Sequence, residues 1–125
     1  MARERILLIR SNDGINIDIA KEIEKEGYNV LLVDNIHDGL KELSGFDPHL
    51  VIVANGSHIP EIEELCIQTR KNTDALVLVT GKHEDATKMF DIGVDTYLDE
   101  PFSVIELIAK VKSIIRRKIK QIHIN

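Results

Sequence analysis

Five short runs of branched apolar residues recur along the chain, and they constrain its fold more than any other feature. Each run is apolar almost throughout rather than at every second position. Continuous apolarity is typical of strands that are covered on both faces, as in a parallel sheet. The sequence therefore predicts five strands, at residues 6–9, 30–33, 50–53, 76–79 and, more weakly, 96–98.

The segments between these runs have the spacing of helices. Residues 15–23 place apolar side chains on one helical face, although residues 15–19 also alternate in a way that would suit a strand. A stripe of apolar residues at helical spacing makes the last helix the clearest. The predicted helices are residues 15–23, residues 36–43 ended by Ser44 and Gly45, and residues 59–70, 83–92 and 104–119.

Strands that alternate with helices predict one doubly wound α/β domain, with helices on both faces of a parallel sheet. The length of 125 residues suits a single domain. In such folds the functional crevice lies beyond the carboxyl ends of the strands. The loops to inspect therefore begin at Arg10, Asp34, Ala54, Thr80 and Asp99.

Composition narrows the class of protein. Apolar residues make up 43% of the chain and charged residues 30%, which is typical of a globular protein. No apolar run has the length of a membrane span, and the N-terminus lacks the features of a signal peptide, so we expect a cytoplasmic protein. Cys66 is the one cysteine, and its helical spacing favours a buried core thiol.

The segment Gly93-Val94-Asp95-Thr96-Tyr97-Leu98-Asp99-Glu100-Pro101-Phe102-Ser103 is similar to the G-A-D-D-Y-L-x-K-P-F-S segment of response-regulator receiver domains. The earlier strands match the family in order and spacing, so the resemblance covers residues 4–118. It implies a CheY-like, flavodoxin-like sheet with strand order 2-1-3-4-5. The last helix looks most like the OmpR/PhoB subfamily. We expect residues 1–118 to form the domain and residues 119–125 a tail or the start of a linker.

The chain departs from the family where the chemistry takes place. Receivers have two acidic residues after the first strand, whereas this chain has Arg10 and Ser11, followed by Asn12. The phosphoaccepting aspartate is replaced by Ala54, and the lysine before the Pro-Phe pair by Glu100. The resemblance thus implies a pseudo-receiver without a phosphorylation site.

These replacements remove the nucleophile and disfavour a metal ion. Aspartyl phosphate requires a carboxylate, and Mg²⁺ prefers carboxylate oxygens to the fixed positive charge of Arg10. If the first loop is displaced by a residue or two, Asp13 takes the place of the acidic pair. The histidines have no ligand spacing, and no nucleophile is paired with a base, so we expect no metal, no cofactor and no enzymatic activity.

Two positions of the family's switch are retained, the hydroxyl at Thr80 and the aromatic ring at Tyr97. Since the acidic and lysine positions converge in the family, we expect Arg10 and Glu100 to form a charge-reversed ion pair across the pocket. That pair would fill the metal and phosphate positions and lock Thr80.

Charge is distributed unevenly. Residues 1–102 hold 10 basic and 20 acidic side chains, whereas residues 103–125 hold six basic and one acidic. We therefore expect no direct binding of nucleic acid by the body of the domain. The basic segment of residues 116–120 complements the dipole of the last helix or begins a linker.

The resemblance also implies a homodimer through the fourth helix, the fifth strand and the last helix, where Asp95, Glu106 and Lys110 occupy matching positions. Our leading hypothesis is a phosphorylation-independent receiver that regulates a DNA-binding output domain by dimerisation or docking. The alternative is a stand-alone adaptor that binds a kinase or another signalling protein. A small α/β enzyme is the third class considered.

Overall fold

The computed structural model describes residues 3–10, 18–56 and 58–124, with only the backbone of Asp18 and of residues 119–124. Strands and helices alternate along the chain. The strands are β1 (Arg5–Arg10), β2 (Asn29–Val33), β3 (Leu50–Ala54), β4 (Leu76–Gly81) and β5 (Thr96–Asp99). The helices are α1 (Asp18–Lys25), α2 (Ile36–Phe46), α3 (Ile59–Asn72), α4 (Ala86–Asp91) and α5 (Val104–Ile124), with a 3-10 turn at His83–Asp85.

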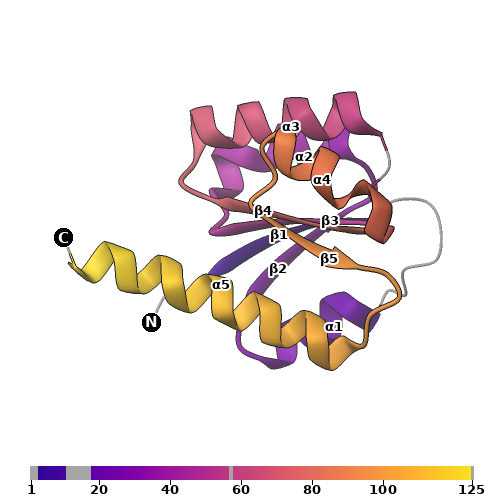
Figure 1. The fold of residues 1–125 in the computed structure, drawn as a ribbon. Coiled ribbons are helices and arrows are strands. Elements are labelled where there is room, and N and C mark those ends of the chain that lie inside the picture. The colour runs from indigo at the N-terminus through magenta and orange to yellow at the C-terminus, as the bar shows by residue number, and fades with distance from the viewer. Residues whose placement is uncertain (1–2, 11–17, 57, 125) are drawn as a thin grey trace.

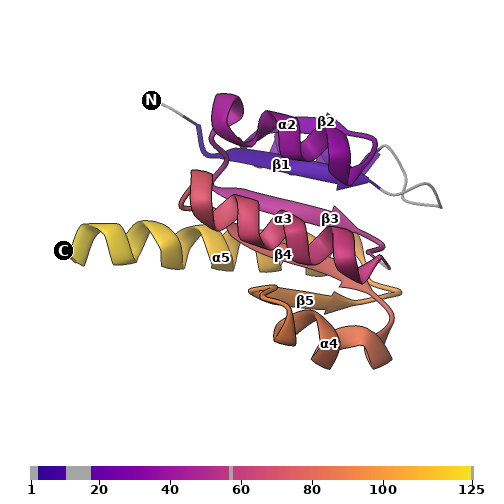
Figure 2. The same ribbon diagram turned by 90° about the horizontal axis from the view of Figure 1, so that it is seen from above.

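The five strands form one parallel sheet in the order β2-β1-β3-β4-β5, which confirms the predicted fold. Helices α2, α3 and α4 cover one face of the sheet, and α1 and α5 cover the other (Figure 1). Figure 2 shows the strand order from above the first of these faces. Ile9 is in register with Val33 and with Val53, so β1, β2 and β3 end within one residue of one another.

Alternate residues of each strand enter two separate cores. On one face, Leu7 and Val51 pack with Leu65 and Cys66 of α3 and Met89 of α4. On the other face, a second core forms against α1 and α5 from Ile6, Leu8, Ile23, Ile52, Leu107 and Val111. The central strands β1, β3 and β4 are therefore buried on both sides, which is why their sequences are apolar throughout, whereas the edge strands β2 and β5 are only partly buried. Cys66 is 0% exposed, as predicted, and burial raises the pKa of its thiol.

Helix α2 continues past the end that the sequence predicts. Ser44 and Gly45 lie within it, and it ends at Phe46, which packs against the core. Asp47 then takes a left-handed conformation (φ 49°), and its N–H donates to the carbonyl of Leu43. Burial of Phe46 outweighs the low helix propensity of Ser44 and Gly45, so the predicted end was wrong.

Helix α5 begins with a reciprocal cap. The Ser103 hydroxyl accepts a hydrogen bond from Glu106 N–H, and Glu106 Oε1 accepts one from Ser103 N–H, both at 3.1 Å. This capping box satisfies two backbone donors that the first turn leaves free. The backbone stays helical to Ile124.

The domain boundary expected at residue 118 remains a prediction. None of the described helices is both long and apolar enough to cross a membrane.

Candidate functional site

The carboxyl ends of the strands bring four predicted residues to one edge of the sheet. Arg10 ends β1 and is in register with Ala54, which ends β3. Thr80 is the second-last residue of β4, and Glu100 directly follows β5. Ala54 is 2% exposed, so its methyl group is packed into the edge. Three predicted positions of the first loop lie outside the described residues, namely Ser11, Asn12 and Asp13.

Arg10 does not pair with Glu100, so the expected ion pair was wrong. Its Nε donates to Asp34 Oδ1 at 3.0 Å, and Nη2 of Arg10 lies 3.0 Å from the same oxygen. Asp34 follows β2, the immediate neighbour of β1, whereas Glu100 lies three strands from β1. At roughly 4.8 Å per strand that separation is about 14 Å, too far for the two side chains to meet easily. The Arg10–Asp34 pair is exposed and is worth about 0 to 1 kcal/mol.

Glu100 instead accepts a hydrogen bond from the neighbouring strand. The Thr80 hydroxyl donates to Glu100 Oε2 at 2.7 Å and accepts from Asn55 N–H at 2.8 Å. Thr80 is 1% exposed, so both functions of its hydroxyl are satisfied inside the protein. Thr80 therefore bonds to Glu100 directly, without the Arg10–Glu100 pair that was expected to lock it.

Tyr97 lies beneath the loop that follows β4. Its hydroxyl donates to the carbonyl of Lys82 at 2.7 Å, and its ring packs against the core that α2, α3 and α4 cover. A Cβ on Gly81 would come within 2.4 Å of the Tyr97 hydroxyl oxygen, so this approach requires glycine. Burial, and then the charges of Asp85 and Glu100, raise the pKa of Tyr97 to about 12.

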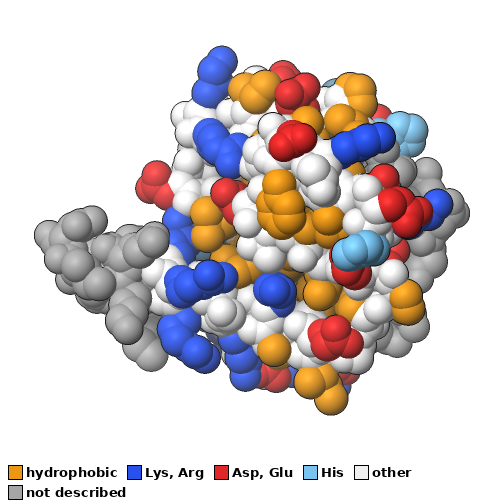
Figure 3. Space-filling view, in the orientation of Figure 1, with side chains coloured by type: hydrophobic (Ala, Val, Ile, Leu, Met, Phe, Trp, Pro, Cys, Tyr) orange, Lys and Arg blue, Asp and Glu red, His pale blue; other side chains and the backbone are white. Residues whose placement is uncertain are grey.

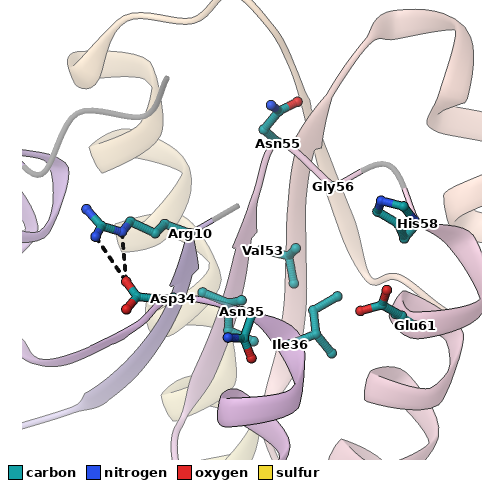
Figure 4. A pocket seen from close by; sticks show the side chains of 10 residues that line it. Arg10, Asp34, Asn35, Ile36, Val53, Asn55, Gly56, His58 and Glu61 are labelled. Carbon is teal, nitrogen blue, oxygen red and sulfur yellow. Dashed lines mark hydrogen bonds and ion pairs between the residues drawn. The ribbon is translucent and has the colours of Figure 1, made fainter. Parts of the chain in front are cut away.

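A cavity of about 260 Å³ opens at the ends of β1 and β3. The apolar side chains of Ile36 and Val53 line its inner wall (Figure 4), and Ile9 also lines the cavity. The Arg10–Asp34 pair stands on one side, and His58 and Glu61 stand on the other, at the start of α3. Asn35, Asn55 and Gly56 complete the lining.

Known proteins resemble this chain in sequence and in fold. No protein-family model matches the chain. PhoP of Bacillus subtilis, an alkaline phosphatase synthesis transcriptional regulatory protein, is 28% identical over 91% of this chain and 49% of its own length. PhoB of Escherichia coli, a phosphate regulon transcriptional regulatory protein, is 28% identical over 94% of the chain and 53% of its length. The chain thus spans about half the length of these relatives.

Solved structures show the same fold. A CheY-like receiver domain protein from Methanospirillum hungatei superposes with a TM-score of 0.81 at 17% identity, over 96% of this chain and 99% of that one. An atypical orphan response regulator superposes at 0.74 with 23% identity, over 90% and 95% of the two chains. The chain therefore has the CheY-like receiver fold, and its sequence is similar to response regulators. Its curated relatives are of the OmpR/PhoB type.

The side chains at this edge do not fit the Mg²⁺ that the resemblance to receiver domains implies. Mg²⁺ needs hard oxygen ligands, usually from one or two carboxylates. At the described edge, Asp34 is bound by Arg10, Glu100 by Thr80 and Asp99 by His83. The side chain of Ala54 supplies no oxygen. Among the described residues, no three His, Cys, Asp or Glu side chains group as metal ligands would.

Two of the three residues expected at a dimer face have partners within the chain. Asp95 Oδ2 accepts from Val77 N–H at 2.8 Å, and Asp95 Oδ1 lies 3.3 Å from Nη2 of Arg70. Glu106 belongs to the cap of α5. Lys110, by contrast, has no ion-pair partner within 4.0 Å in the part of the chain that the structure describes.

Sequence reasoning missed His58, Glu61 and the partner of Arg10. One signal for that partner was present, because Asp34 directly follows the second apolar run and β2 neighbours β1 in the predicted strand order. His58 and Glu61 carry no comparable signal. They reach the cavity only because α3 begins beside the end of β3.

Proposed function

We propose that this domain is a cytoplasmic, phosphorylation-independent receiver that acts by dimerisation or partner docking, as the regulatory part of a DNA-binding transcriptional regulator. Ala54 at the end of β3 carries the proposal, because a methyl group there cannot accept a phosphoryl group. The pairing of Asp34 with Arg10 and of Glu100 with Thr80 supports it.

The output half of the proposal is supported by the relatives. PhoP and PhoB are named transcriptional regulatory proteins, and the receiver domain matches about half of each. We propose that the DNA-binding part of this regulator lies outside the receiver. The atypical orphan regulator among the solved structures is described as having a phosphorylation-independent regulatory mechanism. We propose the same independence for this domain.

The proposed docking surface is formed by α4, β5 and α5. Phe90 is 51% exposed, Val104 40% and Ile105 81%. Figure 3 shows hydrophobic side chains over the α4 and β5 region and Lys and Arg side chains along α5. Since Asp95 and Glu106 already have partners within the chain, we propose that apolar contacts hold the dimer together and that charges contribute little.

Phosphodonor treatment tests the proposal directly. Incubation with acetyl phosphate and Mg²⁺ is expected to leave the intact mass of the domain unchanged, because the nucleophile is missing. A Mg²⁺-dependent gain of one phosphoryl group would contradict the proposal.

The variant Ala54→Asp is also expected to stay unphosphorylated. Arg10 would still repel Mg²⁺ and Glu100 the phosphoryl oxygens. We expect recovery only when Arg10→Asp, Ser11→Asp, Ala54→Asp and Glu100→Lys are combined. Efficient phosphorylation of Ala54→Asp alone, measured by intact mass, would contradict this account of the edge.

A further inference from the structure

Thr80 connects the loop after β3 to the residue after β5. Its hydroxyl accepts from Asn55 N–H at 2.8 Å and donates to Glu100 Oε2 at 2.7 Å. Gly56 N–H also donates to the carbonyl of Thr80 at 2.9 Å. Because Thr80 is 1% exposed, water has little access to replace either partner of the hydroxyl. One buried side chain therefore fastens the β3 loop to Glu100.

The end of β5 also holds the loop that leads into α4. Glu100 N–H donates to the carbonyl of Gly81 at 2.7 Å, and the Tyr97 hydroxyl donates to the carbonyl of Lys82 at 2.7 Å. Glu100 is thus bonded through its side chain to Thr80 and through its backbone to Gly81, the residue after Thr80. The path of residues 80–82 depends on where Glu100 lies.

Helix α4 depends on this loop for its position. It has six residues, and Met89 is the one that is buried. A helix of this length is not stable by itself, so the segments at its two ends determine where it lies. At its beginning, His83 of the 3-10 turn contacts Asp99, with 2.7 Å between Nδ1 and Oδ2. A change in residues 81–85 would therefore move α4 and the exposed Phe90.

We propose that Glu100 is a positioning residue in a relay that runs from Asn55, through Thr80, to the loop before α4. With its carboxylate in place, the relay holds the α4 face in one arrangement without any phosphate. Asn55 lines the 260 Å³ cavity, so the relay also connects that cavity to the α4 face. The relay depends on the proposed function in one respect, which is that the α4 face is taken to be the docking surface.

Amide hydrogen exchange of the whole chain, followed by NMR, tests the relay. Glu100→Ala and Thr80→Val are each expected to accelerate exchange about tenfold at Asn55 and across residues 82–90, because both remove the Thr80–Glu100 bond. Leu7 and Val51, at the centre of the sheet, are expected to exchange as in the wild type. Glu42→Ala, which removes an exposed acid on α2, is the matched control and should change neither group.

Two conservative variants separate the hydrogen bond from the charge. Glu100→Gln keeps an oxygen acceptor and Thr80→Ser keeps the hydroxyl, so both are expected to exchange like the wild type. If Glu100→Gln behaves like Glu100→Ala, the acceptor role is wrong.

The relay would also be overturned by faster exchange confined to residues 99–101, or by an equal acceleration at Leu7 and Val51. Phosphorylation is not measured in this experiment. A phosphorylated wild-type domain would contradict the proposed function and leave the exchange result intact, so the two proposals can fail separately.

Discussion

Gly81 illustrates how one missing side chain sets the position of an aromatic ring. The Tyr97 hydroxyl and the carbonyl of Gly56 both approach the place where a Cβ would be, at 2.4 and 3.3 Å. Tyr97 is held there by its bond to Lys82. At the residue scale, then, the loop before α4 depends on packing as well as on hydrogen bonds.

Gly81→Ala is expected to push Tyr97 out of its place and break its bond to Lys82. The combined overpacking and lost hydrogen bond should lower the free energy of unfolding by about 1 to 3 kcal/mol. The pKa of Tyr97, now about 12, should fall toward 10 as burial is lost. Urea unfolding and ultraviolet titration of tyrosinate measure the two effects. In the control Gly45→Ala, the new methyl group meets nothing within 4 Å, so neither loss should appear.

His49 gives the stability of the domain a predictable pH dependence. Its Nδ1 accepts a hydrogen bond from Arg5 N–H at 2.9 Å, and burial, followed by the charge of Arg5, lowers its pKa. The unfolded chain binds a proton near the ordinary pKa of about 6.5, but the folded chain resists it. The stability present above about pH 6.5 is therefore lost as the pH falls from there to the folded pKa, by at most about 1.4 kcal/mol per pH unit.

His49→Asn tests this origin, because it removes the titrating ring and keeps a side-chain oxygen acceptor. Between pH 7.5 and 5.5, urea unfolding of the wild type is expected to lose more stability than unfolding of the variant. Parallel losses in the two proteins would assign the pH dependence to other groups.

Helix ends are the elements whose local chemistry is easiest to isolate. The cap of α5 uses only Ser103 and Glu106, which lie three residues apart at the start of the helix. The same helix supplies Leu107 and Val111 to the core beneath the sheet. A loosened cap would therefore weaken the packing of the whole second layer.

Ser103→Ala is expected to lower the free energy of unfolding by about 1 kcal/mol, because Glu106 N–H loses its acceptor. Ser113→Ala, the same substitution in the middle of α5, should be neutral or slightly stabilising, since alanine favours helix. Urea unfolding compares the two. Equal effects would show that the capping box does not stabilise α5.

At the scale of the whole molecule, two separate surfaces are open to partners. The carboxyl edge carries the cavity, and the face of α4 and α5 carries the exposed apolar side chains Phe90, Val104 and Ile105. The relay through Thr80 runs between these two places. Self-association through the second surface would leave the cavity open.

Ile105→Asp is expected to abolish self-association, because Ile105 is 81% exposed and buries its apolar surface only in the proposed dimer. Sedimentation velocity measures the dimer fraction, which should change little with added salt. Ile67→Asp, on α3 and 46% exposed, is the control and should leave the dimer intact. Lys110→Glu should weaken the dimer less than Ile105→Asp. If neither variant changed sedimentation in a protein shown to dimerise, another face would be the interface.

The sequence by itself determined the layers of this protein. Branched apolar runs placed five strands correctly, and their unbroken apolarity predicted burial on both faces, because each strand contributes alternate side chains to two cores. The order of the runs also placed Arg10, Ala54, Thr80 and Glu100 at one edge of the sheet. The replacement of the family's aspartate by Ala54 was visible in the sequence alone.

Only the tertiary structure decided which polar groups meet. Arg10 binds Asp34 because β2 lies beside β1, and Glu100 binds Thr80 because β4 lies beside β5. Asp95 accepts a hydrogen bond from Val77 N–H, and Phe46 extends α2, because the fold places each beside its partner. Burial follows from the apolar pattern of each segment. A hydrogen bond or ion pair reaches only a few ångströms, so its partner depends on which strand or helix lies alongside.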